Sequence, residues 1–377
     1  MLTAGETRIV DAARDFAAAH VTPHARAWES GSADSRATLF AAGAAGLLGL
    51  ELPVEHGGSG VSFGCKRQVA EILAGADFGL AMSVVNTHNV ANHLARAAAP
   101  EVASRYVPAL LSGQRSGCTA LTEPGAGSDF SAIATLARKV GNEWQLDGHK
   151  AWIVNAAHAD VLVVYAQTEP GSGARGIAAF VVDGTRSGFV REARADTAVA
   201  RSIDTGSFIL HGYRASPDEL LHPPGEAFKA ALASINGART YVAAMCCGMV
   251  QECLRLAGTY GAERHTFGKP LHEHQGWRWC LADAVIDLTA ARLMVDAAVA
   301  LIDDGRDAQA AAAHAKVFAT RMAGRHIAAL MHAMGAEGLL AKLPFTRHLA
   351  AAQVATLVDG STEMLLERVA RGLRSIG

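Results

Sequence analysis

The chain lacks long apolar runs. None of its apolar stretches reaches the roughly 18 residues that a membrane-spanning helix needs, so we predict no membrane segment and no membrane partner. Residues 1–7 contain no basic stretch followed by an apolar one, which is the mark of an export signal. We therefore expect a cytoplasmic protein.

Cysteine and charge are also sparse. The six cysteines form no CxxC pair, which argues against a zinc site and against a disulfide scaffold. We expect them to be small buried side chains, and we expect no metal. The formal net charge is −2, without the basic excess that binding to nucleic-acid phosphates needs. We therefore expect no nucleic-acid partner.

The chain is rich in apolar residues and long. Half of its residues are apolar and only 19% are charged, a composition typical of a compact globule. At 377 residues it exceeds one ordinary domain, so we expect two or three packed units.

Three regions differ in the spacing of their apolar residues. Over residues 1–117 these residues recur every three or four positions, which is typical of one face of a helix. Residues 118–222 hold short β-branched runs, and Asp147-Gly148 among them predicts a hairpin turn. Helical spacing resumes in longer segments over residues 223–377. We predict a helical domain, a small β domain and a second helical domain with these bounds.

A tight polar loop lies at the start of the β region. Thr122 to Asp129 read TEPGAGSD, and a proline with small residues lets backbone amides approach a ligand closely. Residues 152–155, WIVN, lie in the segment through which we expect the chain to return after Asp147-Gly148.

Two further motifs lie in the second helical region. Residues 263–270 read ERHTFGKP and are followed by His274-Gln275. An arginine suits a pyrophosphate, because its planar pair of donors meets two oxygens of fixed spacing. Residues 358–363, VDGSTE, come near the end of the chain.

In this order and at these separations, the motifs resemble those of the acyl-CoA dehydrogenases, a family of flavoproteins. The resemblance runs over nearly the whole chain. It implies a mainly α fold with a central β-barrel: an N-terminal α-helical domain, the barrel and a C-terminal four-helix bundle. It also implies FAD as cofactor and an acyl-CoA as substrate.

The resemblance also implies where the flavin lies. In the family the polar loop covers the flavin, the tryptophan packs on its ring, and the arginine motif reaches the FAD of a neighbouring subunit. A homodimer or homotetramer is therefore expected. A looser match at residues 332–338 marks a second contact with the neighbour's cofactor. The implied cofactor-binding residues are Leu121, Thr122, Gly127, Ser128, Trp152, Val154, Arg264, Phe267, Gln275, His332, Gly335, Ala336, Ser361 and Glu363.

The resemblance assigns the catalytic base to Asp359, where the family usually has glutamate. In the family this carboxylate takes the α-proton of the thioester while a β-hydride leaves to flavin N5. The amide of the base residue helps by donating a hydrogen bond to the thioester carbonyl. Aspartate is one methylene shorter and stops about 1.5 Å back, a misplacement that can cost on the order of 10²-fold in rate. The family's second place for the base is occupied here by Ala238.

A second departure is Val154, where the family has a hydroxyl residue that bonds the N5 edge of the flavin. Valine supplies only its backbone, so we expect FAD to bind with altered chemistry at N5. The implied substrate-binding residues are Asn86, Ser128, Arg239, Val358 and Gly360. Because Asn86 begins a polar set at residues 86–93, we expect a short, branched, cyclic or polar acyl group. The implied electron acceptor is an electron-transfer flavoprotein.

Three alternatives stay open. An acyl carrier protein could replace CoA, and a basic patch beside the pocket would favour it. Asp359 together with Val154 could indicate an oxidase of the nitroalkane type, although its partner arginine has no obvious counterpart here. A flavin-binding protein without dehydrogenase activity is the third, but the basic tail expected of it is missing.

Overall fold

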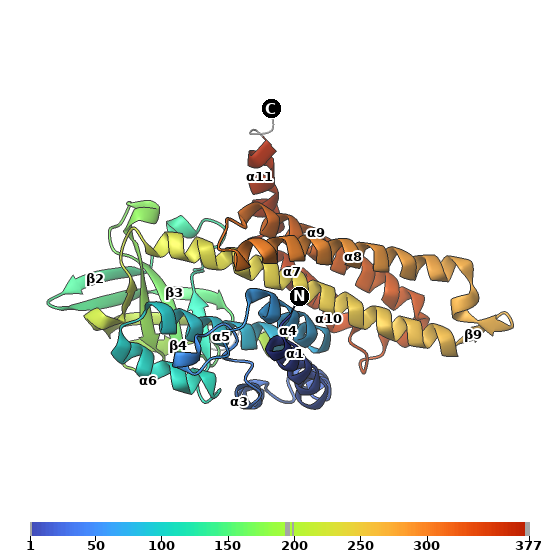
Figure 1. Cartoon of the computed structure of the whole chain (residues 1–377). Helices are drawn as coiled ribbons and strands as arrows, with labels where there is room; N and C mark the ends of the chain where they lie inside the picture. The colour runs from blue at the N-terminus through green and yellow to red at the C-terminus, as the bar shows by residue number, and fades with distance from the viewer. Residues whose placement is uncertain (1, 193–196, 198–199, 374–377) are drawn as a thin grey trace. The chain divides into compact units, whose positions relative to one another are not determined.

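The computed structural model describes residues 2–192, 197 and 200–373 of the chain (Figure 1). The chain divides into two compact units. One, called here the bundle unit, combines Met1–Ala33, Phe63–Ala81 and Ile235–Gly377. The other, called the sheet unit, combines Asp34–Ser62 and Met82–Ser234.

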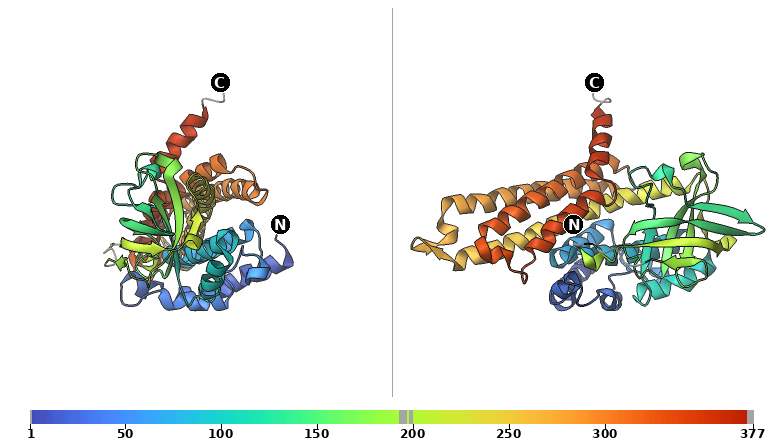
Figure 2. Two further views of the ribbon diagram at one scale, coloured as in Figure 1. Left: turned by 90° about the vertical axis from the view of Figure 1, so that its left-hand side faces the viewer. Right: turned by 180° about the vertical axis from the view of Figure 1, so that it is seen from behind.

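Long helices dominate the bundle unit, and Figure 2 shows them from two further directions. Its elements are α1 (Ala4–Phe16), a π-helical turn (Ala17–Val21), α2 (Ala25–Glu29), α4 (Phe63–Ala76), most of α7 (Ala227–Glu263), α8 (Gln275–Asp303), α9 (Gln309–Ala333), α10 (Phe345–Leu357) and α11 (Thr362–Leu373). Helix α9 packs against α8, α10 and α11. Ala312, Ala315 and Ala319 are fully buried on α9, and such small side chains allow neighbouring helices to approach closely.

The sheet unit combines helices with eight strands. Its helices are α3 (Arg36–Ala44), most of α5 (Phe78–Ala97) and α6 (Pro100–Leu111). Its strands are β1 (Gly117–Ala120), β2 (Leu136–Val140), β3 (Glu143–Ile153), β4 (Val161–Gln167), β5 (Ile177–Asp183), β6 (Phe189–Arg191), β7 (Gly206–Ala215) and β8 (Leu220–His222). The strand order is β6-β7-β3-β2-β4-β5-β8, and β1 pairs in parallel with β4.

Strands β4 and β5 are buried on both faces, which explains their continuous apolar sequences. On one face Val163 and Tyr165 join a core formed with α5 and α6. On the other face Leu162 and Val164 join an interior to which all eight strands contribute. An interior lined by every strand of the sheet is typical of a barrel. The predicted fold class, mainly α with a central β domain, is confirmed.

The predicted hairpin turn at Asp147-Gly148 is wrong. Strand β3 continues through both residues, with an irregularity in its pairing with β7 between Leu146 and Gly148, and the turn lies six residues earlier, at Gly141-Asn142. Gly148 is needed for another reason: a Cβ there would lie 2.4 Å from the hydroxyl of Thr135. Asp147 accepts a hydrogen bond from the amide of Gly212 on β7, at 2.7 Å. The pair therefore marks a close approach of strands and not a reversal of the chain.

Two expectations from composition can be compared with the structure. All six cysteines are free; five are buried and Cys280 is partly exposed, which confirms the expectation of small, mostly buried side chains. Among the helices of residues 2–192, 197 and 200–373, none combines the length and the apolar character that crossing a membrane requires.

A buried ion pair supports the loop after β1. The ammonium of Lys150, on β3, donates to the Glu123 carboxylate at 2.8 Å and to the carbonyl of Leu121 at 2.9 Å. Burial by itself would raise the pKa of the Glu123 carboxyl, but the charge and hydrogen bonds of Lys150 hold that pKa below its usual range. The carboxylate also accepts the amides of Ala134 and Thr135. Loop and strand are thereby fixed to each other.

We predict that Lys150→Met lowers the free energy of unfolding by about 3 kcal/mol, because it leaves a buried carboxylate without its cation. Urea unfolding followed by circular dichroism measures this change. The double variant Lys150→Met with Glu123→Gln removes both charges and should lose less than the single variant. A single variant as stable as the parent would show that the pair contributes nothing.

Candidate active site

The predicted site residues divide between the two units. The sheet unit holds the polar loop, the tryptophan segment and Asn86, whereas the bundle unit holds the arginine motif, Arg239 and Asp359.

The polar loop turns its carbonyls toward the sheet. Glu123 and Ala126 exchange two backbone hydrogen bonds of 3.1 Å around Pro124-Gly125, which closes a tight turn. The carbonyl of Thr122 accepts the amide of Ala151 at 3.2 Å, next to the bond between Lys150 and Leu121. Within the described residues, the amides of Thr122, Gly127 and Ser128 donate to nothing. The loop therefore presents open donors.

Trp152 stands out from the end of β3. Its backbone has a φ of +61°, a strained value for a bulky residue, at an irregularity in the pairing of β3 with β7. Its side chain is 65% exposed. Asn155, also at positive φ, fixes the segment by donating from Nδ2 to the carbonyls of Ser83 and Gly117. Val154 lies between these two residues and is half-buried.

These features fit FAD. Open loop amides suit the carbonyl oxygens of a flavin and the oxygens of its pyrophosphate. A large exposed aromatic ring on a fixed, strained backbone suits a flat ring system, and such strain gathers at functional sites. The residues of the sheet unit thus offer both the donors and the stacking surface that the cofactor needs.

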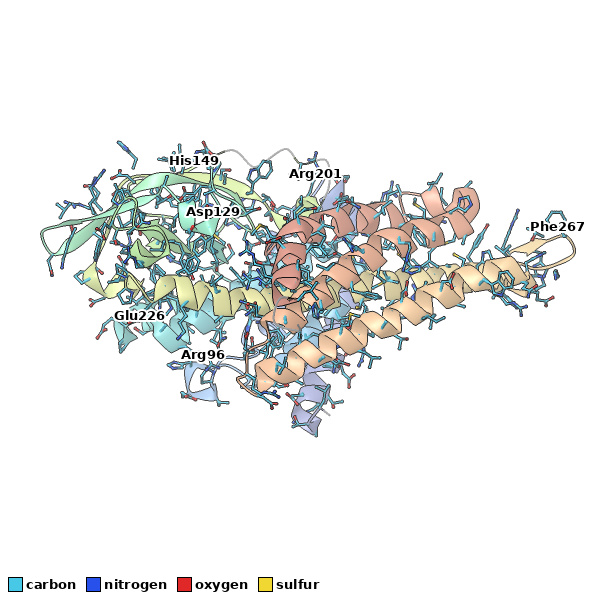
Figure 3. All side chains as sticks on the ribbon, turned by 90° about the horizontal axis from the view of Figure 1, so that it is seen from above. Arg96, Asp129, His149, Arg201, Glu226 and Phe267 are labelled. Carbon is cyan, nitrogen blue, oxygen red and sulfur yellow. The ribbon has the colours of Figure 1, made fainter. Side chains whose placement is uncertain are left out.

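The arginine motif forms a small hairpin in the bundle unit. Strands β9 (His265–Thr266) and β10 (Lys269–Pro270) enclose Phe267 and Gly268, both at positive φ, which is a type I′ turn. Figure 3 labels Phe267 at the tip, where its side chain is 97% exposed. Arg264 is exposed and makes no ion pair with any residue between 2 and 373 that the structure describes.

Trp277 brings the remaining cofactor-binding candidates of the bundle unit to the end that carries the hairpin. The ring nitrogen of Trp277, on α8 two residues after Gln275, donates to the carbonyl of Ala333 at 2.9 Å. On its other side the ring packs on Gly261 of α7, where a Cβ would come within 2.1 Å of it. The structure therefore brings the hairpin, Gln275 and the loop after α9 together. His332, in the last turn of α9, and Gly335 and Ala336, just after that helix, are exposed.

Ser361 precedes helix α11, and Glu363 lies in the first turn of that helix. The hydroxyl of Ser361 accepts the amide of Met364 at 3.4 Å. The amide of Glu363 and the hydroxyl of Ser361 hold the pKa of the Glu363 carboxyl below its usual range. The structure thus gives both residues a role in capping a helix.

Asp359 lies in the turn between α10 and α11, with a φ of +54°. Its carboxylate oxygen Oδ2 is buried and accepts no hydrogen bond from the described residues, although the residue as a whole is partly exposed. Arg239, buried on α7, donates from Nε to the Asp359 carbonyl at 3.0 Å. Gly360 follows at a φ of +101°, so the two positive φ values make a sharp turn. Val358 ends α10 just before it.

Burial dominates the electrostatics of this turn. It raises the pKa of the Asp359 carboxyl above the ordinary value, against the lowering effect of the charges on Lys316 and Arg239. It also lowers the pKa of Arg239 to about 10, an effect that Arg368 strengthens and Asp359 opposes. A carboxylate with a raised pKa and an unpaired oxygen is a candidate proton acceptor.

The sequence reasoning missed Lys316. It lies on α9, only 1% exposed, and its ammonium donates to the carbonyls of Val358 and Gly360. A signal was available, because this lysine stands among alanines on the apolar face of a helix, where a charged residue is rare unless it is paired.

Most of the polar side chains at positions 86–93, on α5, form hydrogen bonds to other residues of the sheet unit. His88 is buried between the carbonyl of Leu48 and the carboxylate of Glu51. The hydroxyl of Thr87 accepts the amide of Gly117 at 3.3 Å. Asn86 donates to the carbonyl of Met82, one turn earlier, and is partly exposed.

Comparison with known proteins covers nearly the whole chain. Residues 3–114, 118–212 and 225–374 match the N-terminal, middle and C-terminal domains of acyl-CoA dehydrogenase. The short-chain specific acyl-CoA dehydrogenase of Bos taurus is 33% identical over 353 residues, which are 93% of this chain and 85% of that protein. The glutaryl-CoA dehydrogenase of Desulfococcus multivorans is 30% identical over 356 residues, or 93% and 92% of the two chains.

Comparison with a solved structure leads to the same family. Butyryl-CoA dehydrogenase from Megasphaera elsdenii superposes with a TM-score of 0.94 at 27% identity, over 99% of both chains. These likenesses confirm the predicted family, its FAD cofactor and its class of enzyme. The chain belongs to the acyl-CoA dehydrogenase family, whose members are FAD-binding oxidoreductases acting on a CH–CH bond.

Proposed function

We propose that the chain forms a trans double bond between the α and β carbons of a short acyl-CoA, with Asp359 as the base. The observation that carries this proposal is the buried, unpaired Oδ2 of Asp359 on a strained turn. Leaving a carboxylate oxygen in this state costs free energy, and proteins retain such groups where a reaction uses them.

Asp359 takes the α-proton as the electrons of that C–H bond move toward the thioester carbonyl. Its raised pKa makes it a stronger proton acceptor than an ordinary aspartate. The amide of Asp359 donates to the carbonyl oxygen as charge develops there, and Val358 and Gly360 line the thioester. Arg239 fixes the turn through the Asp359 carbonyl. When bound, FAD supplies the acceptor for the hydride that leaves the β carbon.

The chain holds the cofactor with two sets of residues. Within one subunit, the amides of the polar loop, the ring of Trp152 and the backbone of Val154 would hold the flavin. Ser361 and Glu363 would contact the adenine half. From a neighbouring subunit, Arg264, Phe267, Gln275, His332, Gly335 and Ala336 would contact the cofactor.

A short acyl group is favoured by two observations. The relatives named above act, by their names, on short-chain and glutaryl thioesters. Asn86 is one of the partly exposed members of the α5 polar set and so is available to a substrate, whereas Thr87 and His88 are buried and bond within the protein. We propose an electron-transfer flavoprotein as the electron acceptor.

The test is an anaerobic titration of the flavin-loaded protein with short, branched, cyclic and polar acyl-CoAs. Loss of the visible flavin absorbance with a short thioester is the expected result. No reduction by any member of the panel would overturn the proposal. Reduction by carrier-bound but not CoA-bound acyl groups would favour an acyl carrier protein as substrate carrier. Oxygen consumption with nitroethane would favour an oxidase instead.

We predict that Asp359→Asn binds FAD normally but is reduced about 10²- to 10⁴-fold more slowly, because the amide cannot accept the proton. Stopped-flow absorbance measures this rate. The matched control is Asp304→Asn, which changes an exposed aspartate at the end of α8 and should leave the rate unchanged. An Asp359→Asn variant that is reduced as fast as the parent would remove Asp359 as the base.

We also propose a homodimer or homotetramer. Helix α8 carries a row of exposed apolar side chains seven residues apart: Trp279, Ile286 and Leu293, which are 61%, 65% and 66% exposed. Such a row is typical of a surface that packs against another helix. Phe267 adds a fully exposed ring on the same unit.

The double variant Ile286→Asp with Leu293→Asp should therefore sediment as a smaller species and lose FAD, because the neighbour's cofactor contacts are lost with the interface. Sedimentation velocity and the flavin-to-protein absorbance ratio measure both effects. Val190→Asp, at an exposed apolar residue of β6, is the control and should change neither. An unchanged oligomer in the double variant would place the interface elsewhere.

A further inference from the structure

The turn that carries Asp359 is held through its carbonyls by two cations. Three consecutive carbonyls, those of Val358, Asp359 and Gly360, each accept a hydrogen bond from a buried cationic side chain. Arg239 binds the middle one at 3.0 Å, and Lys316 binds the outer two, that of Gly360 at 2.6 Å. Three neighbouring peptide groups are thus fixed by two residues.

The hydrogen bonds of Lys316 go to the backbone and not to the nearby carboxylate, whose Oδ2 remains without a partner. Burying an ammonium is costly, and a neutral donor would satisfy the same carbonyls at lower cost. Burial in fact lowers the pKa of Lys316 to about 8, against the effect of Asp359 and Cys246, which raise it. The charge at this position therefore needs a reason beyond support of the turn.

Peptide geometry supplies a reason. All described peptide bonds are trans, so each amide N–H points opposite to the carbonyl of the same peptide plane. The Val358 carbonyl faces Lys316, so the amide of Asp359 faces away from Lys316. That amide donates to nothing among the described residues. A cation on the carbonyl of a peptide also polarises it and makes its N–H a stronger donor.

We propose that Lys316 is a positioning residue of the reaction, which holds and polarises the Val358–Asp359 peptide so that the Asp359 amide stabilises the enolate oxygen of the thioester. This inference rests on the proposed function. Loss of the α-proton leaves the electron pair of the C–H bond shared between the α carbon and the carbonyl oxygen. The proton goes to Asp359, and the negative oxygen receives the amide that Lys316 strengthens.

The test uses a ligand that forms the enolate but cannot go further. Acetoacetyl-CoA has acidic α-protons, and its β carbon carries no hydrogen that could leave as hydride. Its enolate is seen directly in the ultraviolet spectrum. S-butyl-CoA, a thioether with a methylene in place of the carbonyl, is the matched ligand because it offers no oxygen to the Asp359 amide. Both are titrated into the flavin-loaded protein.

We expect Lys316→Met to bind the enolate about 10- to 10²-fold more weakly than the parent. Complete loss of an oxyanion donor lowers stabilisation of the oxyanion by about 10²- to 10³-fold, and in this variant the donor is only weakened. Binding of the thioether should change less than about twofold, because no oxyanion is involved. The control variant Lys229→Met removes an exposed lysine of α7 and should leave both affinities unchanged.

Each other outcome has a definite meaning. Equal enolate binding by Lys316→Met and the parent would overturn the role of Lys316 while leaving the proposed function intact. An equal loss for both ligands would also overturn it, since the lysine would then serve only the fold. A parent that forms no enolate and is reduced by no thioester would overturn the proposed function and this inference together. If Lys316→Met does not fold, Lys316→Gln, which keeps a neutral donor, is compared with the parent in the same way. An enolate affinity of Lys316→Gln equal to that of the parent would overturn the proposal, because the charge would not be needed.

Discussion

Buried cations bound to backbone carbonyls are the constraint on which the base turn depends. A turn with two successive positive φ values is not a favoured conformation for a residue with a side chain, and it persists only where its surroundings fix it. Lys316 and Arg239 fix the turn by donating hydrogen bonds to all three of its carbonyls. The ammonium of Lys316, which bonds the C-cap residue Val358, also lies at the C-terminal end of α10, where the negative end of the helix dipole favours a cation.

The same arrangement occurs in the other unit. At the polar loop, the buried Lys150 donates a hydrogen bond to the carbonyl of Leu121. The amide of the next residue, Thr122, donates to none of the described residues. In each place a lysine donates hydrogen bonds to the carbonyls of a tight loop or turn from within the protein. The amide side then remains available for a ligand. Loops built in this way present donors of fixed direction, which is what stabilisation of developing charge requires.

The motifs could be predicted from the sequence because each depends on local chemistry. The polar loop, the tryptophan segment and Asp359 all lie in strained or tightly bonded backbone, and glycine, proline and small residues mark such backbone. Lys316 and the pair of Lys150 with Glu123 could not be placed, because their partners come from distant parts of the chain. Asp147-Gly148 misled for a similar reason: the contact that requires the glycine is with Thr135, on the neighbouring chain segment. The domain bounds stay a prediction.

Aspartate at position 359 affects the strain of the backbone as well as the reach of the carboxylate. A φ of +54° is left-handed, a region that costs most residues about 1–2 kcal/mol but that aspartate enters more readily than longer residues do. The shorter side chain therefore gives up reach but holds this turn with less strain. The carboxylate of this short side chain is buried within reach of the charges of Lys316 and Arg239, which oppose the rise in its pKa. Reach, backbone strain and pKa are thus coupled at one residue, and a change in its length alters all three together.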